Sequence, residues 1–276
     1  MIVAVAGWRG IGTTTTALLL ALELAGAHGQ SWLIEADPAG GSLAGRLQLP
    51  GETVGALERI AFPTARTDAT TSFTDGAAAF GRISVVTAPV DPFRAHACHQ
   101  PRLPWVPALA ELGAPVVVDV GRLRAASPVW PVLHHCDAMV LTTAPEVAAA
   151  VGAAEWLRAG GRVSPSDPVL PDGRCRIAVV DAPGGVAFPR ATLRADLGEE
   201  WGSWLPWEPS TVDLVHRGAP STDRRLRKST LLGAVHELHT ALPAPATPAF
   251  GTAPANPANP AAPAAPANPA AMRAGS

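Results

Sequence analysis

The 276-residue sequence contains no tyrosine and a single lysine, Lys228, although 21 of its residues are Lys or Arg. Arginine therefore carries almost every positive charge, and no lysine is available near the N-terminus to serve a phosphate-binding loop. The three cysteines, at 98, 136 and 175, are odd in number and widely spaced, which argues against a disulfide framework and favours a reducing compartment. The formal net charge of −2 gives no overall attraction to nucleic acid or to an anionic membrane.

Long apolar runs and targeting signals are also missing. No apolar stretch reaches the ~20 residues that are needed to span a bilayer. The first apolar run, residues 2–6, has no basic region before it and is followed by Gly-Trp-Arg-Gly, unlike a signal peptide. The sequence therefore predicts a soluble, cytoplasmic protein.

Short apolar segments alternate with helical patterns, which is typical of repeated βα units around a parallel sheet. The predicted strands are residues 2–6, 32–35, 83–87, 115–120, 138–142 and 176–181. The predicted helices are residues 14–28, 106–112, 145–159 and 190–197, with two more between 210 and 242, the last over 229–242. Several strands are almost continuous in Val, Ile or Leu, as expected for strands covered on both faces. The predicted fold class is α/β, with a doubly wound, mostly parallel sheet, while residues 62–82 fit no clear element.

The composition changes abruptly after Leu242. Residues 243–276 consist mainly of Ala, Pro and Asn, with Pro-Ala-Asn-Pro as a short repeat. Regular proline prevents a helix, and the segment has almost nothing to bury, so an extended, disordered tail is predicted. The predicted domain organisation is a folded domain over residues 1–242 and a Pro/Ala-rich tail over 243–276.

A glycine-rich turn follows the first predicted strand, where residues 7–14 read GWRGIGTT. This fits the frame G-x-x-x-x-G-x-[ST], placed after a strand and at a helix N-terminus, where backbone amides can cradle a phosphate. The predicted nucleotide-binding residues are Gly7, Arg9, Gly10, Ile11, Gly12, Thr13, Thr14 and Thr15. The alternative is a tight turn between strand and helix that holds no ligand.

The loop resembles the deviant Walker A motif of the MinD/ParA ATPases, K-G-G-x-G-K-[ST]-T. On that pattern Trp8 stands at the family's signature lysine, Arg9 at its first glycine and Thr13 at its loop lysine. Further segments resemble family motifs in the correct order. Residues 34–41 (IEADPAGG) resemble the D-x-D-P-x-G-N segment, and residues 116–119 (VVVD) resemble the Walker B strand. Residues 205–208 and 218–220 resemble the closing P-x-D … G-x-P stretch. The resemblance spans roughly residues 1–242.

The resemblance implies a P-loop domain that binds Mg-ATP or Mg-ADP between two subunits. It would give Thr14 a metal-coordinating hydroxyl, Asp37 a role in orienting water and Asp119 a contact to the Mg²⁺ shell, so Asp37 and Asp119 are the predicted catalytic residues. Losing a charged phosphate contact costs roughly 1.5–3 kcal/mol of binding, whereas losing a group aimed at transition-state charge costs about 10²–10³ in rate. Because both lysines are absent, hydrolysis should suffer more than binding, unless Arg9 substitutes for them.

Other polar clusters suggest weaker hypotheses. His96, Cys98 and His99, and also His134, His135 and Cys136, contain zinc-ligand types without the paired spacing of a strong zinc motif. The run Arg224, Arg225, Arg227 and Lys228 could contact DNA phosphates or anionic lipid, but a solvated helix entry is the simpler interpretation. Trp201, Trp204 and Trp207 fall at every third residue around a further predicted strand, in addition to the six clearest ones, and fit core packing better than a docking surface.

The functional prediction is a degenerate MinD/ParA-like protein with weak or no ATP hydrolysis. It would act as a positioning or regulatory partner in bacterial cell division, chromosome partitioning, or pilus or secretion assembly, as a homodimer or with protein partners. One alternative is a slow but genuine partitioning ATPase that uses Arg9. Another is an interaction scaffold that works without nucleotide.

Overall fold

A computed structural model of the chain describes residues 1–8, 11–63, 68–100, 105–124, 127–161, 173–183, 188–220 and 222–244. Eight strands form one sheet: β1 (Ile2–Gly7), β2 (Ser31–Glu35), β3 (Ala78–Phe80), β4 (Ile83–Val86), β5 (Val116–Arg122), β6 (Ala138–Thr143), β7 (Cys175–Val180) and β8 (Trp201–Leu205). Their order across the sheet is β3-β4-β2-β5-β1-β6-β7-β8. Every neighbouring pair is parallel except β3 with β4, which is antiparallel. The predicted α/β, mostly parallel sheet is therefore confirmed.

The helices of the described residues fall between these strands. They are α1 (Thr13–His28), α2 (Leu43–Arg46), α3 (Ala56–Ala61), α4 (Ala69–Gly76), α5 (Pro92–Ala97), α6 (Trp105–Ala108), α7 (Trp130–His135), α8 (Val147–Arg158), α9 (Arg190–Leu197), α10 (Pro209–His216), α11 (Arg224–Arg227) and α12 (Thr230–Ala241). Short 3-10 turns cover Gly51–Thr53, Leu109–Glu111 and Gly198–Glu200.

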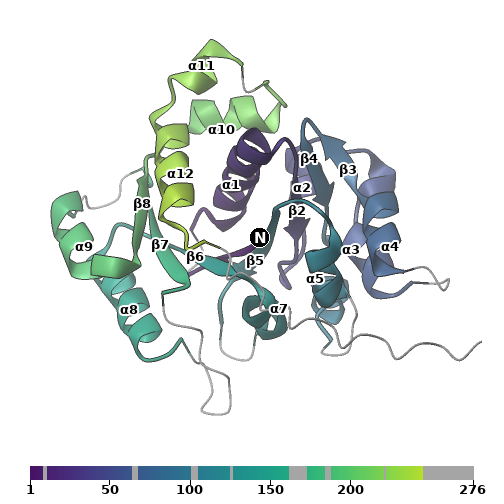
Figure 1. Cartoon of the computed structure of the whole chain (residues 1–276), viewed down its shortest axis with the longest axis horizontal. Helices are drawn as coiled ribbons and strands as arrows, with labels where there is room; N and C mark the ends of the chain where they lie inside the picture. Colours follow the sequence, from purple (N-terminus) through teal and green to yellow (C-terminus); the bar gives the residue numbers. More distant parts are fainter. Residues whose placement is uncertain are drawn as a thin grey trace, which may run out of the picture. The chain divides into compact units, whose positions relative to one another are not determined.

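Alternate side chains of the central strands enter two separate cores. Val3 and Val5 of β1 pack with apolar residues of α1 and α12 on one face of the sheet. Ile2 and Ala4 pack on the other face with residues of α3, α4, α7, α8 and α9. Figure 1 shows α1 and α12 side by side on the first face. Because both faces are covered, the strands can be apolar throughout, and the sheet is doubly wound.

The structure also places the elements that the sequence left open. Residues 62–82 contain α4 and the antiparallel strand β3. A three-residue edge strand is too short to show an alternating pattern, which explains why it was not predicted. The helix predicted over 106–112 is instead the short α6 followed by a 3-10 turn, and the helix predicted over 145–159 begins at Val147 after the cap residue Glu146.

The predicted tail, residues 243–276, lies outside the described residues from 245 onward. Among the described helices, none combines the length and the apolar character that a bilayer crossing requires.

Candidate functional site

The turn between β1 and α1 lies at the carboxyl edge of the parallel strands, where α/β proteins bind ligands. Gly12 closes this turn in the left-handed region, with φ of 63°, and α1 begins at the next residue. A Cβ at Gly12 would come within 2.9 Å of Val180 Cγ1, at the end of β7. Both the backbone conformation and the close approach therefore require glycine here. Gly7 ends β1 and Ile11 is half-buried, whereas Arg9 and Gly10 lie outside the described residues.

The two positions of the family's lysines hold side chains that point into the protein. Thr13 is buried, and its Oγ1 lies 3.1 Å from Oγ1 of Thr142 on β6. The indole of Trp8 packs on Trp156 of α8, with 5.2 Å between ring centroids, and Trp156 in turn packs on Trp130. The Trp8 backbone amide donates to the Thr142 carbonyl at 2.8 Å. Both positions are thus tied to β6 and α8 by packing and neutral hydrogen bonds.

On the other side of β1, Asp119 of β5 is fully buried beside the start of α1. Its Oδ1 accepts a hydrogen bond from the Gly121 amide at 3.1 Å, while its Oδ2 has no hydrogen-bond partner among the described residues. Burial raises the pKa of Asp119 to about 7; the nearby Thr14 hydroxyl lowers it, and the carboxyls of Glu35 and Asp37 raise it further. This carboxyl is therefore placed where a cation or a hydrogen-bond donor would stabilise its charged form.

Asp37 follows β2 and lies directly against Gly121. A Cβ at Gly121 would come within 2.1 Å of the Asp37 Cγ, and Gly121 has a φ of 65°. The Asp37 carboxyl accepts a hydrogen bond from the Ala39 amide at 2.8 Å. Burial raises its pKa, while this amide and Arg124 lower it. The two predicted catalytic carboxylates, Asp37 and Asp119, are thus brought to the same edge of the sheet.

Glu35 also belongs to this acidic group, but its carboxyl serves the backbone. It accepts hydrogen bonds from the amides of Ser42 (2.6 Å), Leu43 (2.8 Å) and Ala88 (3.1 Å). Burial raises its pKa, and these three amides counteract the rise. A Cβ at Gly41 would meet the Ala88 carbonyl oxygen at 2.4 Å. Glu35 and Gly41, both departures from the family motif, together hold the loop after β2 against the end of β4.

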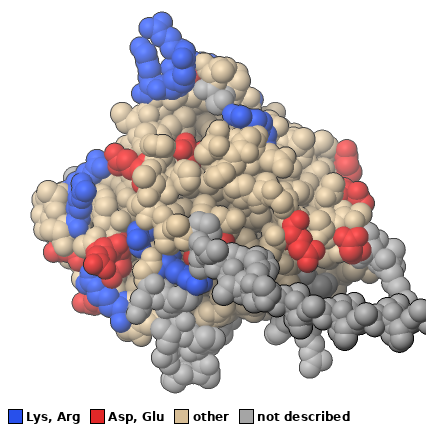
Figure 2. Space-filling view, viewed as in Figure 1, with Lys and Arg blue, Asp and Glu red and all other residues tan. Residues whose placement is uncertain are grey.

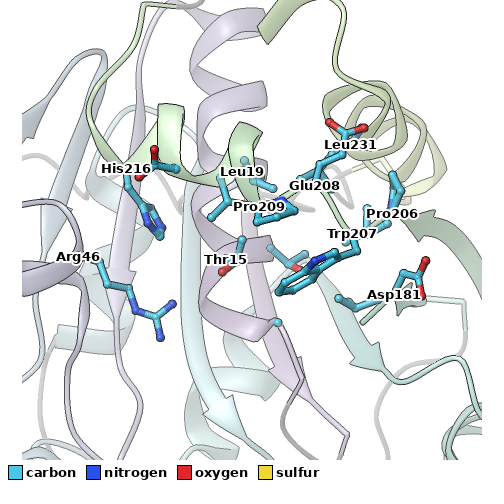
Figure 3. A pocket seen from close by; sticks show the side chains of 16 residues that line it. Thr15, Leu19, Arg46, Asp181, Pro206, Trp207, Glu208, Pro209, His216 and Leu231 are labelled. Carbon is cyan, nitrogen blue, oxygen red and sulfur yellow. The ribbon is translucent and has the colours of Figure 1, made fainter. Parts of the chain in front are cut away.

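A mostly apolar pocket of about 290 Å³ opens beside the glycine turn. It lies between α1, the ends of β7 and β8, and α10. Figure 3 shows Thr15 and Leu19 of α1 on one wall of this pocket. Trp207 and Asp181 lie on one side of these two residues, and Arg46 and His216 lie on the opposite side. Trp207 lies just after β8 and is 54% exposed, so the prediction of core packing is wrong for this tryptophan.

Sequence reasoning did not assign Thr142, Asp181 or Trp207 to the site. Each lies at or just after the end of a parallel strand, and that position is the signal that could have indicated them. The two predicted His/Cys clusters do not gather into a metal site: among the described residues, neither supplies three ligand atoms close together. Cys98, Cys136 and Cys175 are free and buried. Burial lowers the pKa of His99 to about 4.

The architecture is a doubly wound α/β domain with a glycine turn after its first strand and carboxylates after the strands on one side. No family model matches the chain, and no curated protein matches it in sequence. Solved structures do match. A ParA family ATPase from Chlorobium tepidum is 15% identical with a TM-score of 0.63, covering 87% of this chain and 98% of its own.

The septum site-determining protein MinD with Mg-ADP from Pyrococcus horikoshii is also 15% identical with a TM-score of 0.63, covering 86% of this chain and 93% of that one. MinD in the MinC:MinD complex of Aquifex aeolicus is 17% identical with a TM-score of 0.59, covering 87% and 93%. The chain therefore has the MinD/ParA-like fold, and the resemblance read from the sequence motifs is confirmed at the level of the fold.

Proposed function

We propose that this protein binds an adenine nucleotide with Mg²⁺ at the β1–α1 turn and acts as a positioning or regulatory partner, with weak or no ATP hydrolysis. The observation that carries the proposal is a contrast between two sets of residues in the site. The glycine turn, the buried Asp119 carboxyl and the adjoining pocket are present, whereas both lysine positions hold neutral side chains packed into the fold.

Nucleotide binding rests on features that need no lysine. Backbone amides of the turn and the N-terminus of the 16-residue helix α1 favour a phosphate group. The pocket beside Thr15 offers an apolar surface for the base, with Trp207 exposed at its wall and the Asp181 carboxyl at its edge. The MinD structure from P. horikoshii, which is similar in fold, holds Mg-ADP.

A magnesium ion fits the residues on the acidic side of the turn. Thr14 would offer its hydroxyl as a ligand, and Asp119 would hold a metal-bound water through Oδ2, the atom that lacks a partner among the described residues. Bound Mg²⁺ would neutralise the phosphate oxygens and stabilise the charged form of Asp119.

Weak ATP hydrolysis is expected because the side chains at positions 8 and 13 are neutral. An ammonium group at position 13 would contact phosphate oxygens directly, but the Thr13 hydroxyl lies on Thr142. A lysine at position 8 would be free to extend, but the Trp8 ring is held on Trp156. Removing one group aimed at transition-state charge costs about 10²–10³ in rate, so two losses would leave little turnover.

The partner would be a protein of a division, partitioning, pilus or secretion system, bound by this chain alone or as a homodimer. The similar MinD from A. aeolicus was solved in a complex with MinC, which supports a protein partner. A DNA or membrane surface is a weaker proposal that rests on α11. Arg224, Arg225, Arg227 and Lys228 are exposed there, and Figure 2 shows Lys and Arg side chains gathered over this helix.

The test is a calorimetric titration of the full chain with Mg-ATP and with Mg-ADP, followed by a phosphate-release assay on the saturated sample. Micromolar binding without turnover supports the proposal. Sustained phosphate release would instead favour a slow ATPase, for which Arg9→Ala should then abolish the activity. Absence of binding to either nucleotide would favour a scaffold that works without nucleotide.

A further inference from the structure

A group of three metal-ligand side chains lies at the far end of α1 from the glycine turn. Glu23 belongs to α1, whereas His236 and His239 belong to α12, which packs beside it. The Nδ1 atoms of both imidazoles approach the same oxygen, Oε1 of Glu23, at 2.7 Å for His236 and 3.4 Å for His239. The ligand atoms of all three residues lie within 4.8 Å of one another.

Helix geometry brings the two histidines together. Residues three apart lie on the same face of a helix, so His236 and His239 both face α1. Glu23 is separated from His236 by 213 positions along the chain, so the sequence alone gives no sign that these residues meet. Glu23 and His239 are 27% and 22% exposed, and His236 is 70% exposed. Two ligands are thus partly shielded, and the third is open to solvent.

We propose that Glu23, His236 and His239 bind a divalent transition metal ion, with Zn²⁺ as the best match. Two imidazole nitrogens and one carboxylate oxygen form a donor set that Zn²⁺ accepts, at about 2.0–2.2 Å from each ligand atom. Both imidazole nitrogens already face the same carboxylate oxygen. Small side-chain rotations would let these three atoms bind one cation, because each of them offers a lone pair to the ion. A fourth position remains for water or for His28, whose ring centroid lies 6.5 Å from that of His239.

The ion would join the first helix of the chain to the last helix of the described residues. α1 begins at the glycine turn, and α12 is the last helix before residues 243–276. Glu23 is ten residues after Thr13, so the metal site lies about 15 Å along the helix from the turn. The site therefore does not overlap the proposed nucleotide site. Its expected effect is to fix α12 on α1.

The experiment is a calorimetric titration of the full chain, without an affinity tag, with ZnCl₂, combined with thermal unfolding. We expect one ion per chain and a rise in Tm of about 5–10 °C at a free Zn²⁺ concentration of about a hundred times Kd. A Co²⁺ titration should give a visible spectrum without thiolate charge-transfer absorption, which separates this site from any binding at the cysteines.

His236→Gln is the informative variant, because this exposed side chain can be changed with little risk to folding. It should weaken Zn²⁺ binding at least tenfold and remove the Tm rise, and Glu23→Gln should do the same. Glu237→Gln is the matched control, since Glu237 follows His236 on α12 but pairs with Arg190 at 3.8 Å. The proposal is overturned if Zn²⁺ leaves Tm unchanged, or if the variants bind it as the wild type does, since the three residues would then form an ordinary ion pair between helices.

Discussion

The two flanks of β1 differ in the side chains that they place beside the glycine turn. On the β5 and β2 side, Asp119, Asp37 and Glu35 place three carboxyls at the strand ends. On the β6 side, the Trp8 ring packs on Trp156 and the Thr13 hydroxyl meets Thr142. The acidic flank holds three titratable carboxyls, and one carboxyl oxygen, Asp119 Oδ2, lacks a hydrogen-bond partner among the described residues, whereas the opposite flank is neutral and packed.

The difference indicates which residues the fold itself depends on. Glu35 accepts three backbone hydrogen bonds, and Asp119 accepts one, so these carboxyls hold loops as well as facing the site. Lysines in a phosphate loop extend toward the ligand and hold no part of the backbone. Threonine and tryptophan at those two positions are therefore compatible with the fold, and the tryptophan at position 8 makes an aromatic contact with Trp156.

The largest effect is expected for Glu35→Ala. It would leave the buried amides of Ser42, Leu43 and Ala88 without their acceptor, so the free energy of unfolding should fall by about 3 kcal/mol or more. Urea unfolding followed by circular dichroism measures the change. Glu199→Ala is the matched control, because Glu199 is exposed, and it should stay within about 0.5 kcal/mol of the wild type. Equal effects of the two substitutions would contradict a structural role for Glu35.

Asp119→Asn should stabilise the ligand-free protein at alkaline pH. The pKa of Asp119 is raised from 3.8 to about 7, so the folded state binds more protons than the unfolded state within that window. The contribution of this carboxyl to stability is therefore fully present below about pH 4 and is lost as pH rises through about 7. The variant does not titrate, so its stability relative to the wild type should rise by about 2–3 kcal/mol between pH 5 and pH 8.

Urea unfolding of both proteins at pH 5 and pH 8 measures this difference, with Asp75→Asn, at an exposed position, as the control. If the free energies of unfolding of Asp119→Asn and the wild type differ by the same amount at both pH values, the pKa of Asp119 is not raised. If Mg²⁺ binds through Asp119, the same variant should lose Mg²⁺-dependent nucleotide affinity. That would make the acidic flank a place where ligand binding is kept at the expense of stability.

Trp8→Ala should have a smaller effect. It removes the ring contact with Trp156, and an aromatic pair contributes about 0.5–1.5 kcal/mol beyond the area that it buries, so a loss of about 1–2 kcal/mol is expected. Thermal unfolding by calorimetry measures it. Trp207→Ala serves as the comparison, because that ring is 54% exposed and should contribute little to stability. A larger loss at Trp207 than at Trp8 would show that position 8 is not part of the packed flank.

The smallest effect is expected for Thr13→Val, which keeps the β-branched shape and removes the hydroxyl that meets Thr142. Stability should fall by less than about 1 kcal/mol, since Thr142 still has the Ala6 carbonyl as an acceptor at 3.4 Å. Nucleotide affinity should not change, because a hydroxyl turned toward β6 makes no phosphate contact. A clear loss of affinity in a fluorescence titration would mean that Thr13 does face the ligand.

Much of the fold followed from local patterns in the sequence. The strand predicted over 2–6 is β1 without its last residue, and the helix predicted over 190–197 coincides with α9, because apolar runs and helical periodicity are local signals. The antiparallel β3 was missed because three residues are too few to show a periodic pattern, and this strand forms only by pairing with β4. Its position depends on tertiary contacts.

The site was predictable only in part. Gly12, Thr13 and Asp119 could be placed through motif order, since a glycine turn and a buried acidic strand end have fixed places in this fold. The packing of Trp8 on Trp156 and the meeting of Glu23 with His236 could not, because each joins residues more than a hundred positions apart. Such contacts depend on which helices the sheet brings together.

The most direct test of the central claim is to introduce lysine at the two positions where the family pattern has it. Thr13→Lys combined with Trp8→Lys should raise Mg-ATP affinity by about tenfold to a hundredfold over the wild type, the effect of one or more charged phosphate contacts, and should produce measurable phosphate release. Thr13→Met combined with Trp8→Met, which supplies similar length without charge, should do neither. If the lysine variant folds but gains no affinity over the methionine variant, the β1–α1 turn is not a phosphate cradle, and the account is contradicted.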